Sequence, residues 1–490
     1  MRNLLVQVSY RYSRLQVNNW IDMTTLDLRG RDLIIIPSGE LLQLSTPELI
    51  QVLFGPNLPS LVRHNMERDK RHRFLRTKPI YFTSVKNALW KQQTPFEVAF
   101  EERPVLPFET NVSIEPRPYQ QEALTGWLAE GSKGVVVLPT GAGKTFVAAL
   151  AIHETRLWTL AVVPTLDLLQ QWRIALASSL SIDADEIGVF GGGKKELKPI
   201  TVITYDSAAI YPRELKRFGL LIFDECHHLP APGYRLIAES AFTPLRLGLS
   251  ATPERSDMAH AELEILIGPE VYRRSPAELT EGQFLAQYRE IPLEIALSSE
   301  DEARYVEQRR IYRSFLQRRR IVIHSPEEFQ QKIIFLSARD AEARKAMLAW
   351  REARNIAMNA PAKYTEIERL LRLHAGDLVL LFSEYNQVVD EISRRFCLPS
   401  ITYKTPAEER RTILERFRAG QYSKLVTGRV LNEGVDVPDC RVAIIVSGNS
   451  TKREYIQRLG RILRPKSGQA LLYELITTGT TEEDIARRRK

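Results

Sequence analysis

The stretch Gly134-Val-Val-Val-Leu-Pro-Thr-Gly-Ala-Gly-Lys-Thr145 decides the fold of this chain. An apolar, β-branched run ends at Pro139, a glycine-rich turn follows, and a helical pattern begins at Phe146. This order predicts a buried strand, a phosphate-binding loop and a helix. Glycine lets the loop backbone turn its N–H groups towards phosphate oxygens, and the helix N-terminus adds a favourable dipole.

The loop side chains have expected roles towards a nucleoside triphosphate. Lys144 neutralises the β- and γ-phosphates, and the Thr145 hydroxyl coordinates Mg²⁺. A chance Gly-Lys-Thr in a turn is the alternative, but the flanking strand and helix favour a nucleotide site. The pattern departs from Gly-x-x-x-x-Gly-Lys-Thr at its first position, which is leucine here. The residues expected to line the site are Leu138, Pro139, Thr140, Gly141, Ala142, Gly143, Lys144 and Thr145.

A second strand is expected to supply the carboxylates. Leu220-Leu-Ile-Phe-Asp-Glu-Cys-His-His228 is an apolar run followed by two adjacent acids. Asp224 is placed to hold Mg²⁺ together with Thr145. Glu225 is then the group that polarises the attacking water. An Asp-Glu pair at a strand end is usually a solvated turn, but the phosphate loop upstream favours the metal-and-base interpretation.

Length and composition indicate a globular protein of about three domains. The 490 residues are 44% hydrophobic and 26% charged, and Lys plus Arg (68) modestly exceed Asp plus Glu (60). Because no apolar run approaches a membrane span and the N-terminus lacks a signal-peptide core, we expect a cytoplasmic protein without a membrane anchor. Cys226, Cys397 and Cys440 show no Cys-x-x-Cys spacing. We therefore expect neither a disulfide framework nor a zinc or iron–sulfur site.

Two series of alternating strands and helices follow the first hundred residues. Apolar runs at 135–138, 160–163, 200–205, 220–223 and 245–249 alternate with helical stretches such as 166–180. A second series has strands at 378–382, 400–403, 424–427 and 442–446, with helices at 386–396 and from a capping box at Thr405–Glu408 to Arg418. Continuous apolar strands separated by helices predict an α/β fold with two tandem parallel sheets, each covered on both faces.

The predicted organisation has three parts and one insertion. A small N-terminal α+β domain spans 1–112, the first parallel-sheet domain 113–275 and the second 276–490. A strand pair is expected between Tyr288 and Leu297. The segment 301–362 is predicted to be a helical, arginine-rich insertion, with a capping box at Ser325–Glu328 inside it.

Two basic segments are candidate nucleic-acid contacts. Arg63 to Lys78 holds seven Lys or Arg with aromatic residues nearby, which suits either phosphate contact with base stacking or a solvated helix face. In the insertion, a net positive helical face beside a nucleotide motor favours a grip on a phosphate backbone over a merely solvated surface. The insertion residues expected to contact DNA are Arg309, Arg310, Arg313, Arg318, Arg319 and Arg320.

A helical pattern from Lys452 carries two arginines of the second series. Arg461 and Arg464 are three residues apart, so they share one helix face. Guanidinium groups that reach across a cleft stabilise charge on the departing γ-phosphate, an effect on the order of 10³–10⁵ in rate. We therefore predict that they act as arginine fingers on a nucleotide bound by the first sheet.

Six motifs in a fixed order resemble those of superfamily 2 nucleic-acid helicases, over residues 113–490. Arg117-Pro-Tyr-Gln120 resembles the adenine-recognising segment, and 139–145 resembles motif I. The segment 163–169 resembles motif Ia, 224–227 is a DExH form of motif II, and 249–252 resembles motif III. Segments 427–438 and 457–464 resemble motifs V and VI. The resemblance implies two tandem RecA-like domains that use ATP and Mg²⁺.

The resemblance also implies roles for further residues. Arg117, Gln120, Glu433, Gly434 and Asp436 would bind the nucleotide. The residues that would couple hydrolysis to domain movement are His227, Ser250, Ala251 and Thr252. The catalytic set would be Lys144, Asp224, Glu225, Gln457, Arg461 and Arg464.

Within that superfamily the chain is similar to the XPB family of DNA repair and transcription helicases, in its prokaryotic, chiefly archaeal form. The likeness lies in 224–231, 457–465, 472–476 and the arginine-rich insertion, which occupies the place of the family's thumb-like element. The family's Arg-Glu-Asp signature appears as Arg255-Ser256-Asp257, and Arg255 is a candidate DNA contact. The family would place a damage-recognition domain in the first hundred residues.

We therefore expect an ATP-dependent DNA helicase or translocase that acts in repair on duplex or forked DNA. The resemblance implies 3′–5′ polarity and a structure-specific nuclease as partner. Three alternatives stay open at this stage: a DExH RNA helicase, a motor subunit of a restriction or defence system, and a nucleotide-gated scaffold with vestigial hydrolysis.

Overall fold

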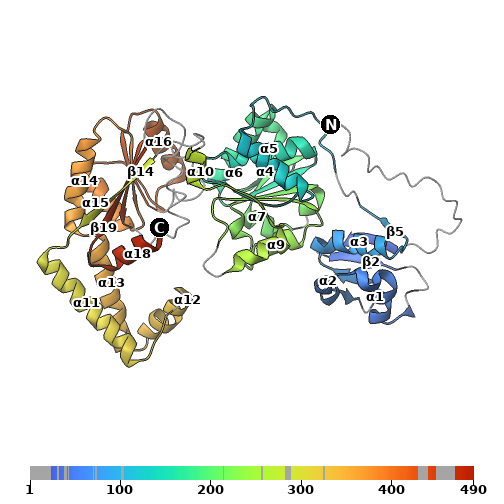
Figure 1. Ribbon diagram of the computed structural model, residues 1–490, viewed down its shortest axis with the longest axis horizontal. Helices are drawn as coiled ribbons and strands as arrows, with labels where there is room; N and C mark the ends of the chain where they lie inside the picture. Colours follow the sequence, from blue (N-terminus) through green and yellow to red (C-terminus); the bar gives the residue numbers. More distant parts are fainter. Residues whose placement is uncertain are drawn as a thin grey trace.

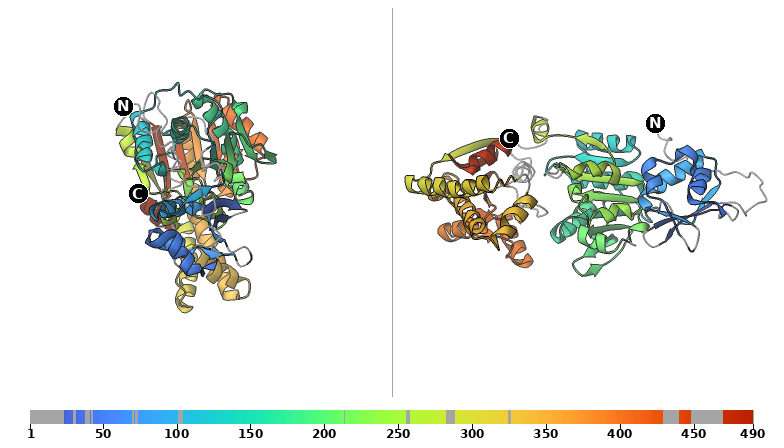
Figure 2. Two further views of the ribbon diagram at one scale, coloured as in Figure 1. Left: turned by 90° about the vertical axis from the view of Figure 1, so that its right-hand side faces the viewer. Right: turned by 90° about the horizontal axis from the view of Figure 1, so that it is seen from below.

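The computed structural model describes residues 24–29, 32–37, 41, 43–69, 71, 74–100, 104–212, 214–254, 258–281, 288–323, 326–428, 440–447 and 470–489. They form three sheet-bearing units, which lie in a row with the second sheet between the other two (Figures 1 and 2). No helix among these residues is long and apolar enough to cross a membrane.

The N-terminal unit is a small mixed sheet with helices packed on it. Its strand order is β3-β4-β2-β1-β5, in which β1 and β2 are antiparallel and β1 and β5 are parallel. The first helix begins with a capping box, in which Glu48 accepts a hydrogen bond from the Ser45 N–H at 2.9 Å. The elements are β1 (Thr24–Arg29), β2 (Asp32–Ile36), α1 (Thr46–Phe54), α2 (Ser60–His64), β3 (Glu67–Arg68), β4 (Leu75–Thr77), α3 (Phe82–Lys91) and β5 (Phe96–Val98).

The predicted basic segment of this unit is largely occupied by contacts within the protein. Arg76 pairs with Glu67 at 2.6 Å, and Lys78 pairs with Glu239 of the next unit at 2.8 Å. Arg63 donates to the Gly55 carbonyl. These contacts favour the solvated-face interpretation for this part of the segment.

The first lobe, as we call the unit that follows, is an eight-stranded sheet of order β13-β6-β12-β11-β7-β10-β8-β9. Its strands are parallel except for β9, which pairs antiparallel with β8. Every residue of β7, β10, β11 and β12 is buried, which explains their unbroken apolar sequence. The strands are β6 (Lys133–Val137), β7 (Thr159–Val163), β8 (Ile187–Gly191), β9 (Lys194–Lys195), β10 (Ile200–Thr204), β11 (Leu220–Asp224), β12 (Leu245–Ser250) and β13 (Glu270–Arg273).

Helices cover both faces of this sheet (Figure 1). The predicted helix at 166–180 has these bounds in the structure. The helices of the first lobe are α4 (Pro118–Ala129), α5 (Lys144–Thr155), α6 (Leu166–Leu180), α7 (Tyr205–Ile210), α8 (Arg235–Glu239), α9 (Leu263–Leu266) and α10 (Pro276–Glu281).

The second lobe is a six-stranded, all-parallel sheet of order β14-β19-β18-β15-β17-β16. The predicted strand pair at 288–297 is wrong: one strand, β14, pairs in parallel with β19 from the far end of the chain. The strands are β14 (Tyr288–Ile295), β15 (Val379–Ser383), β16 (Ser400–Ile401), β17 (Lys424–Thr427), β18 (Val442–Ser447) and β19 (Ala470–Thr477).

The helices of the second lobe include the insertion. The predicted capping box at 405–408 is wrong, because Pro406 is the N-cap of α16 and the Thr405 hydroxyl accepts instead from the Thr402 N–H at 3.0 Å. Ser325 lies outside the described residues. The helices are α11 (Ser299–Arg318), α12 (Pro326–Phe329), a π-helical turn (Gln330–Phe335), α13 (Ala341–Met358), α14 (Pro361–Leu373), α15 (Asn386–Phe396), α16 (Ala407–Arg418) and α18 (Thr481–Arg489). Together these sheets confirm the predicted α/β class with two parallel sheets in tandem.

Candidate functional site

The predicted phosphate loop connects β6 to α5 at the carboxyl end of the strand. Gly141 and Gly143 have φ of +86° and +78°, a region that glycine enters without the strain that a side chain brings. Gly143 caps the N-terminus of α5, so Lys144 and Thr145 occupy the first turn of the helix. This is the strand–loop–helix geometry that binds phosphate.

Leu138, the departure from the glycine-rich pattern, is fully buried in the core. Its N–H donates to the Ser250 carbonyl at 3.0 Å, and its own carbonyl lies 3.4 Å from Lys144 Nζ. Because the side chain fills the core beneath the loop, leucine is compatible with the loop's path at this position.

Two side chains of α4 hold the loop from behind. Tyr119 Oη and Gln120 Nε2 both donate to the Ala142 carbonyl, at 2.8 and 3.1 Å. Gln120 Oε1 accepts from the Arg117 N–H at 3.0 Å. A Cβ atom at Gly143 would lie 2.6 Å from Gln120 Nε2, so this packing requires glycine. The structure thus places the predicted adenine-recognising segment directly against the loop.

The two acids of the DExH segment lie beside the loop. Asp224 is the last residue of β11, and Glu225 follows with a φ of +45°. Lys144 Nζ lies 3.7 Å from Glu225 Oε1, and both side chains are about nine-tenths buried. The structure therefore brings the predicted lysine and the predicted base together, although they lie 81 positions apart in the chain (225 − 144).

Asp224 is held by a residue that sequence reasoning missed. The Trp172 indole of α6 donates to Asp224 Oδ2 at 3.0 Å, and both groups are buried. Burial, with a further contribution from the Glu225 charge, raises the pKa of Asp224 to about 7, while Lys144 and the indole act in the opposite direction. Nothing in the sequence marks Trp172, since its contact depends on the pairing of β7 with β11.

Motif III completes a buried polar chain behind the base. Ser250 Oγ donates to Glu225 Oε2 at 3.3 Å and lies 3.2 Å from His227 Nδ1. It also accepts from the Thr252 N–H at 3.2 Å. Through Ser250, the base on β11 is thus linked to the segment Ala251–Thr252 that leaves β12.

The described residues of this region fit a nucleoside triphosphate with a magnesium ion. The buried hydroxyls of Thr140 and Thr252 have no hydrogen-bond partner among the described residues. No group of three or more His, Cys, Asp or Glu that could hold a metal ion occurs in that part of the chain. Mg²⁺ characteristically takes only one or two protein ligands and leaves the rest to phosphates and water, so Thr145 and Asp224 suffice as candidate ligands.

Seven predicted site residues lie outside the described residues: Arg255, Glu433, Gly434, Asp436, Gln457, Arg461 and Arg464. The two lobes nevertheless touch near the first sheet's carboxyl edge. Arg410 of α16 forms an ion pair with Asp167 in the first turn of α6, at 2.8 Å.

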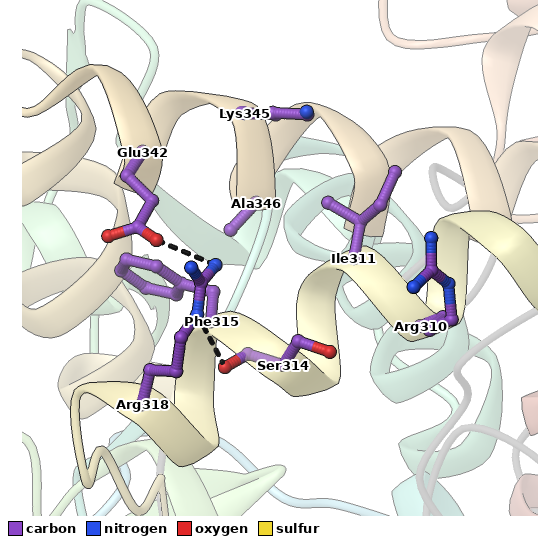
Figure 3. A pocket seen from close by; sticks show the side chains of 8 residues that line it. All are labelled: Arg310, Ile311, Ser314, Phe315, Arg318, Glu342, Lys345 and Ala346. Carbon is purple, nitrogen blue, oxygen red and sulfur yellow. Dashed lines mark hydrogen bonds and ion pairs between the residues drawn. The ribbon is translucent and has the colours of Figure 1, made fainter.

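The six arginines of the insertion that were predicted to contact DNA fall into two groups. Arg310 pairs with Glu307, Arg318 with Glu342, and Arg319 with Asp340 and Glu342. Arg309, Arg313 and Arg320 form no ion pair with a described residue. Figure 3 shows a small pocket between α11 and α13, in which Arg318 of α11 points to Glu342 of α13.

Comparisons with known proteins cover most of the chain. Residues 113–255 match the family "Type III restriction enzyme, res subunit", and 362–466 match "Helicase conserved C-terminal domain". The DNA 3′-5′ translocase XPB2 of Sulfurisphaera tokodaii is 44% identical over 398 residues, which are 80% of this chain and 89% of the relative.

More distant relatives are longer than this chain. The DNA 3′-5′ helicase XPB of Kineococcus radiotolerans is 31% identical over 76% of this chain and 62% of its own length. The putative DNA 3′-5′ helicase Rad25 of Halobacterium salinarum is 33% identical over 78% of this chain and 58% of its own length. Among solved structures, the Hef helicase domain of Pyrococcus furiosus matches 76% of the chain with a TM-score of 0.55 and 17% identity, a likeness of fold that fits tandem RecA-like domains.

Proposed function

This chain belongs to the XPB family of superfamily 2 DNA helicases, and we propose that it is an ATP-driven 3′–5′ DNA helicase or translocase acting in repair. Its named relatives include a translocase and helicases of that polarity. The observation that supports this activity best is the approach of Lys144 Nζ to Glu225 Oε1, 3.7 Å apart beside the phosphate loop.

Hydrolysis uses residues of the first lobe. The Lys144 ammonium pairs with β- and γ-phosphate oxygens, which releases Glu225 from its contact with the lysine. Glu225 then orients a water molecule and accepts its proton as the water oxygen attacks the γ-phosphorus, and the bond from this phosphorus to the β–γ bridging oxygen breaks, so that ADP leaves. Gln120 and Tyr119 keep the loop in place, because both donate to the Ala142 carbonyl.

Mg²⁺, held by Thr145 and Asp224, would offset the negative charge of the phosphates. The indole of Trp172 orients the Asp224 carboxylate for this role. The buried carboxylate of Asp224 has a raised pKa, which a positive neighbour would lower.

The second lobe is proposed to close on the nucleotide. Arg461 and Arg464 offset the negative charge on the departing γ-phosphate. Gln457 positions the water. The residues that line the nucleotide pocket from the second lobe are Glu433, Gly434 and Asp436. The hydrogen bonds that join Glu225, Ser250 and Thr252 are proposed to pass the state of the nucleotide to the segment that leaves β12.

The insertion and the first hundred residues are proposed to hold the substrate. The six arginines at 309–320, with Arg255, contact the phosphate backbone of duplex or forked DNA, and most of this contact is independent of base sequence. A structure-specific nuclease is the proposed partner, by family resemblance.

A strand-displacement assay tests the proposed activity. With ATP, the protein should displace a strand from a duplex with a 3′ single-stranded tail and leave a 5′-tailed duplex intact. Triplex displacement without strand separation would assign translocation alone. Equal action on both tails, or turnover only with RNA, would contradict the proposal.

A further inference from the structure

The end of the insertion carries an exposed apolar ridge, which consists of Ile334, Phe335 and Ala338. The Phe335 side chain is 60% exposed and that of Ile334 43%, and Ala338 is exposed as well. Soluble proteins seldom gather large apolar groups on their surface without a binding role. The ATP site does not explain why these apolar side chains are exposed, so we looked for a separate binding role for the ridge.

A π-helical turn creates this ridge. Gln330–Phe335 forms one π turn between α12 and α13, and such turns are frequent at functional sites. Ile333 is fully buried against the insertion's own core, with Phe315 and Ala346. The next two side chains, Ile334 and Phe335, are turned outwards. Packing of the insertion thus does not require Phe335.

The surroundings of the ridge are positive. From Arg309 to Lys345 the sequence has ten Lys or Arg against four Asp or Glu. Three of these acids are already paired: Glu328 with Lys332, Asp340 with Arg319, and Glu342 with Arg318.

Two exposed arginines of the insertion lack such a partner among the described residues. Arg339, next to Ala338, is exposed and forms no ion pair with a described residue, and the same holds for Arg320. Lys332 Nζ donates to the Val322 carbonyl at 2.8 Å, which holds the loop after Arg320 against the π turn. Unpaired positive charge around an aromatic ring suits a polyanion with flat bases better than a neutral protein surface.

The position of the ridge leaves it accessible. Figure 1 shows α11 and α13 extending away from the sheet of the second lobe, with α12 at their far end. The ridge follows α12 directly in the chain. It therefore lies at the end of the arm that we propose to grip DNA.

We propose that Phe335 stacks on an unpaired base where a DNA fork opens, while Arg339 and Arg320 contact the phosphates on either side. Proteins that unstack DNA commonly insert an apolar side chain between bases. This assignment rests on the proposed DNA-directed function and names the residue that would meet the junction.

The test compares binding of the full chain, without nucleotide, to a fork and to a fully paired duplex of equal length. A 2-aminopurine at the fork junction reports stacking by its fluorescence. Phe335→Ala should weaken fork binding about tenfold, since a base–aromatic stack is of that order, and should leave duplex binding within about twofold. Phe335→Trp should retain both fork affinity and quenching.

Leu348→Ala is the matched control, because Leu348 is 53% exposed on α13 of the same insertion. It should bind both DNAs as the wild type does. Fork affinity and quenching unchanged in Phe335→Ala would overturn the proposal and assign the ridge to a protein partner. An equal loss on fork and duplex would overturn it too. The ATPase of the wild type, measured with and without DNA, tests the proposed function separately from this binding comparison.

Discussion

Lys144 of the phosphate loop and Glu225 of the DExH segment face each other, with 3.7 Å between Nζ and Oε1. Their side chains are 10% and 11% exposed, so the pair lies in a partly dehydrated setting where charge interactions are strong. The lysine starts the first turn of α5 and the acid follows β11. Binding of phosphate and activation of water thus meet at one edge of one sheet.

Glu225→Gln should lower ATP turnover by about 10²–10⁴, because the amide keeps the shape of the base but cannot accept the proton. ATP binding, measured with a fluorescent analogue, should persist. Glu239→Gln is the matched control, since Glu239 is a buried acid of the same lobe that pairs with Lys78. Unchanged turnover in Glu225→Gln would move the assignment towards a nucleotide-gated scaffold.

Ser250→Ala should separate hydrolysis from movement on DNA. The hydroxyl joins Glu225 to the Thr252 N–H, so its loss breaks the link and leaves the lysine and the acid in place. We expect turnover within about tenfold of the wild type, with strand displacement lost. Ser393→Ala serves as control, because Ser393 on α15 donates a comparable hydrogen bond to the Leu398 carbonyl. A parallel fall in both activities would argue against a coupling role.

Neutralising Arg318, Arg319 and Arg320 to Gln should weaken DNA binding and reduce its dependence on salt, by roughly one unit of slope per lost phosphate contact. To contact phosphate, Arg318 must break its ion pair with Glu342, and Arg319 must break its ion pair with Asp340. Arg320 forms no ion pair with a described residue, so it has none to break. We therefore expect Arg320→Gln to have the largest single effect.

Arg372→Gln is the matched control for this series, since Arg372 is 80% exposed on α14 outside the insertion. Binding measured from low to moderate salt gives the slope. If the salt dependence of DNA binding has the same slope as in the wild type, these arginines form a solvated surface and do not contact DNA phosphates.

Lys133→Met should stabilise the protein at neutral pH. Burial, with the nearby Arg246 charge, lowers the pKa of Lys133 to about 8 from 10.5. The unfolded chain thus binds more protons than the native one between pH 8 and 10.5. The free energy of unfolding therefore rises with pH across that window, by at most about 3 kcal/mol. Below pH 8 the buried lysine is charged, and its full destabilising effect is present.

The measurement for Lys133 is the difference in unfolding midpoint between wild type and variant. The variant should be the more stable at pH 7, and the difference should shrink as the pH rises from 8 to 10. Lys194→Met, at an exposed position of β9, should show no such trend. A difference independent of pH would contradict the assignment.

The sequence predicted the strands that run through the core and the loop that binds phosphate. Runs such as Leu220–Phe223 are apolar because both faces of the sheet are covered, and this property is local. The pairing of β14 with β19 could not be foreseen, because it joins segments from opposite ends of the second lobe. The misplaced cap at Thr405 has a local cause, since Pro406 took the N-cap position.

The candidate site divides in the same way. Lys144, Asp224 and Glu225 belong to motifs with fixed spacing, so their roles could be proposed in advance. Trp172 contacts the site only through the packing of α6 against the sheet. No spacing in the chain marks such contacts.

The most direct test of the central claim is ATP turnover in the presence of duplex DNA, forked DNA and single-stranded RNA of equal length, for the wild type and Lys144→Ala. We predict that both DNAs stimulate the wild type, that RNA does not, and that Lys144→Ala is inactive with all three. Full turnover in Lys144→Ala, or stimulation by RNA alone, would contradict a DNA motor driven from this loop.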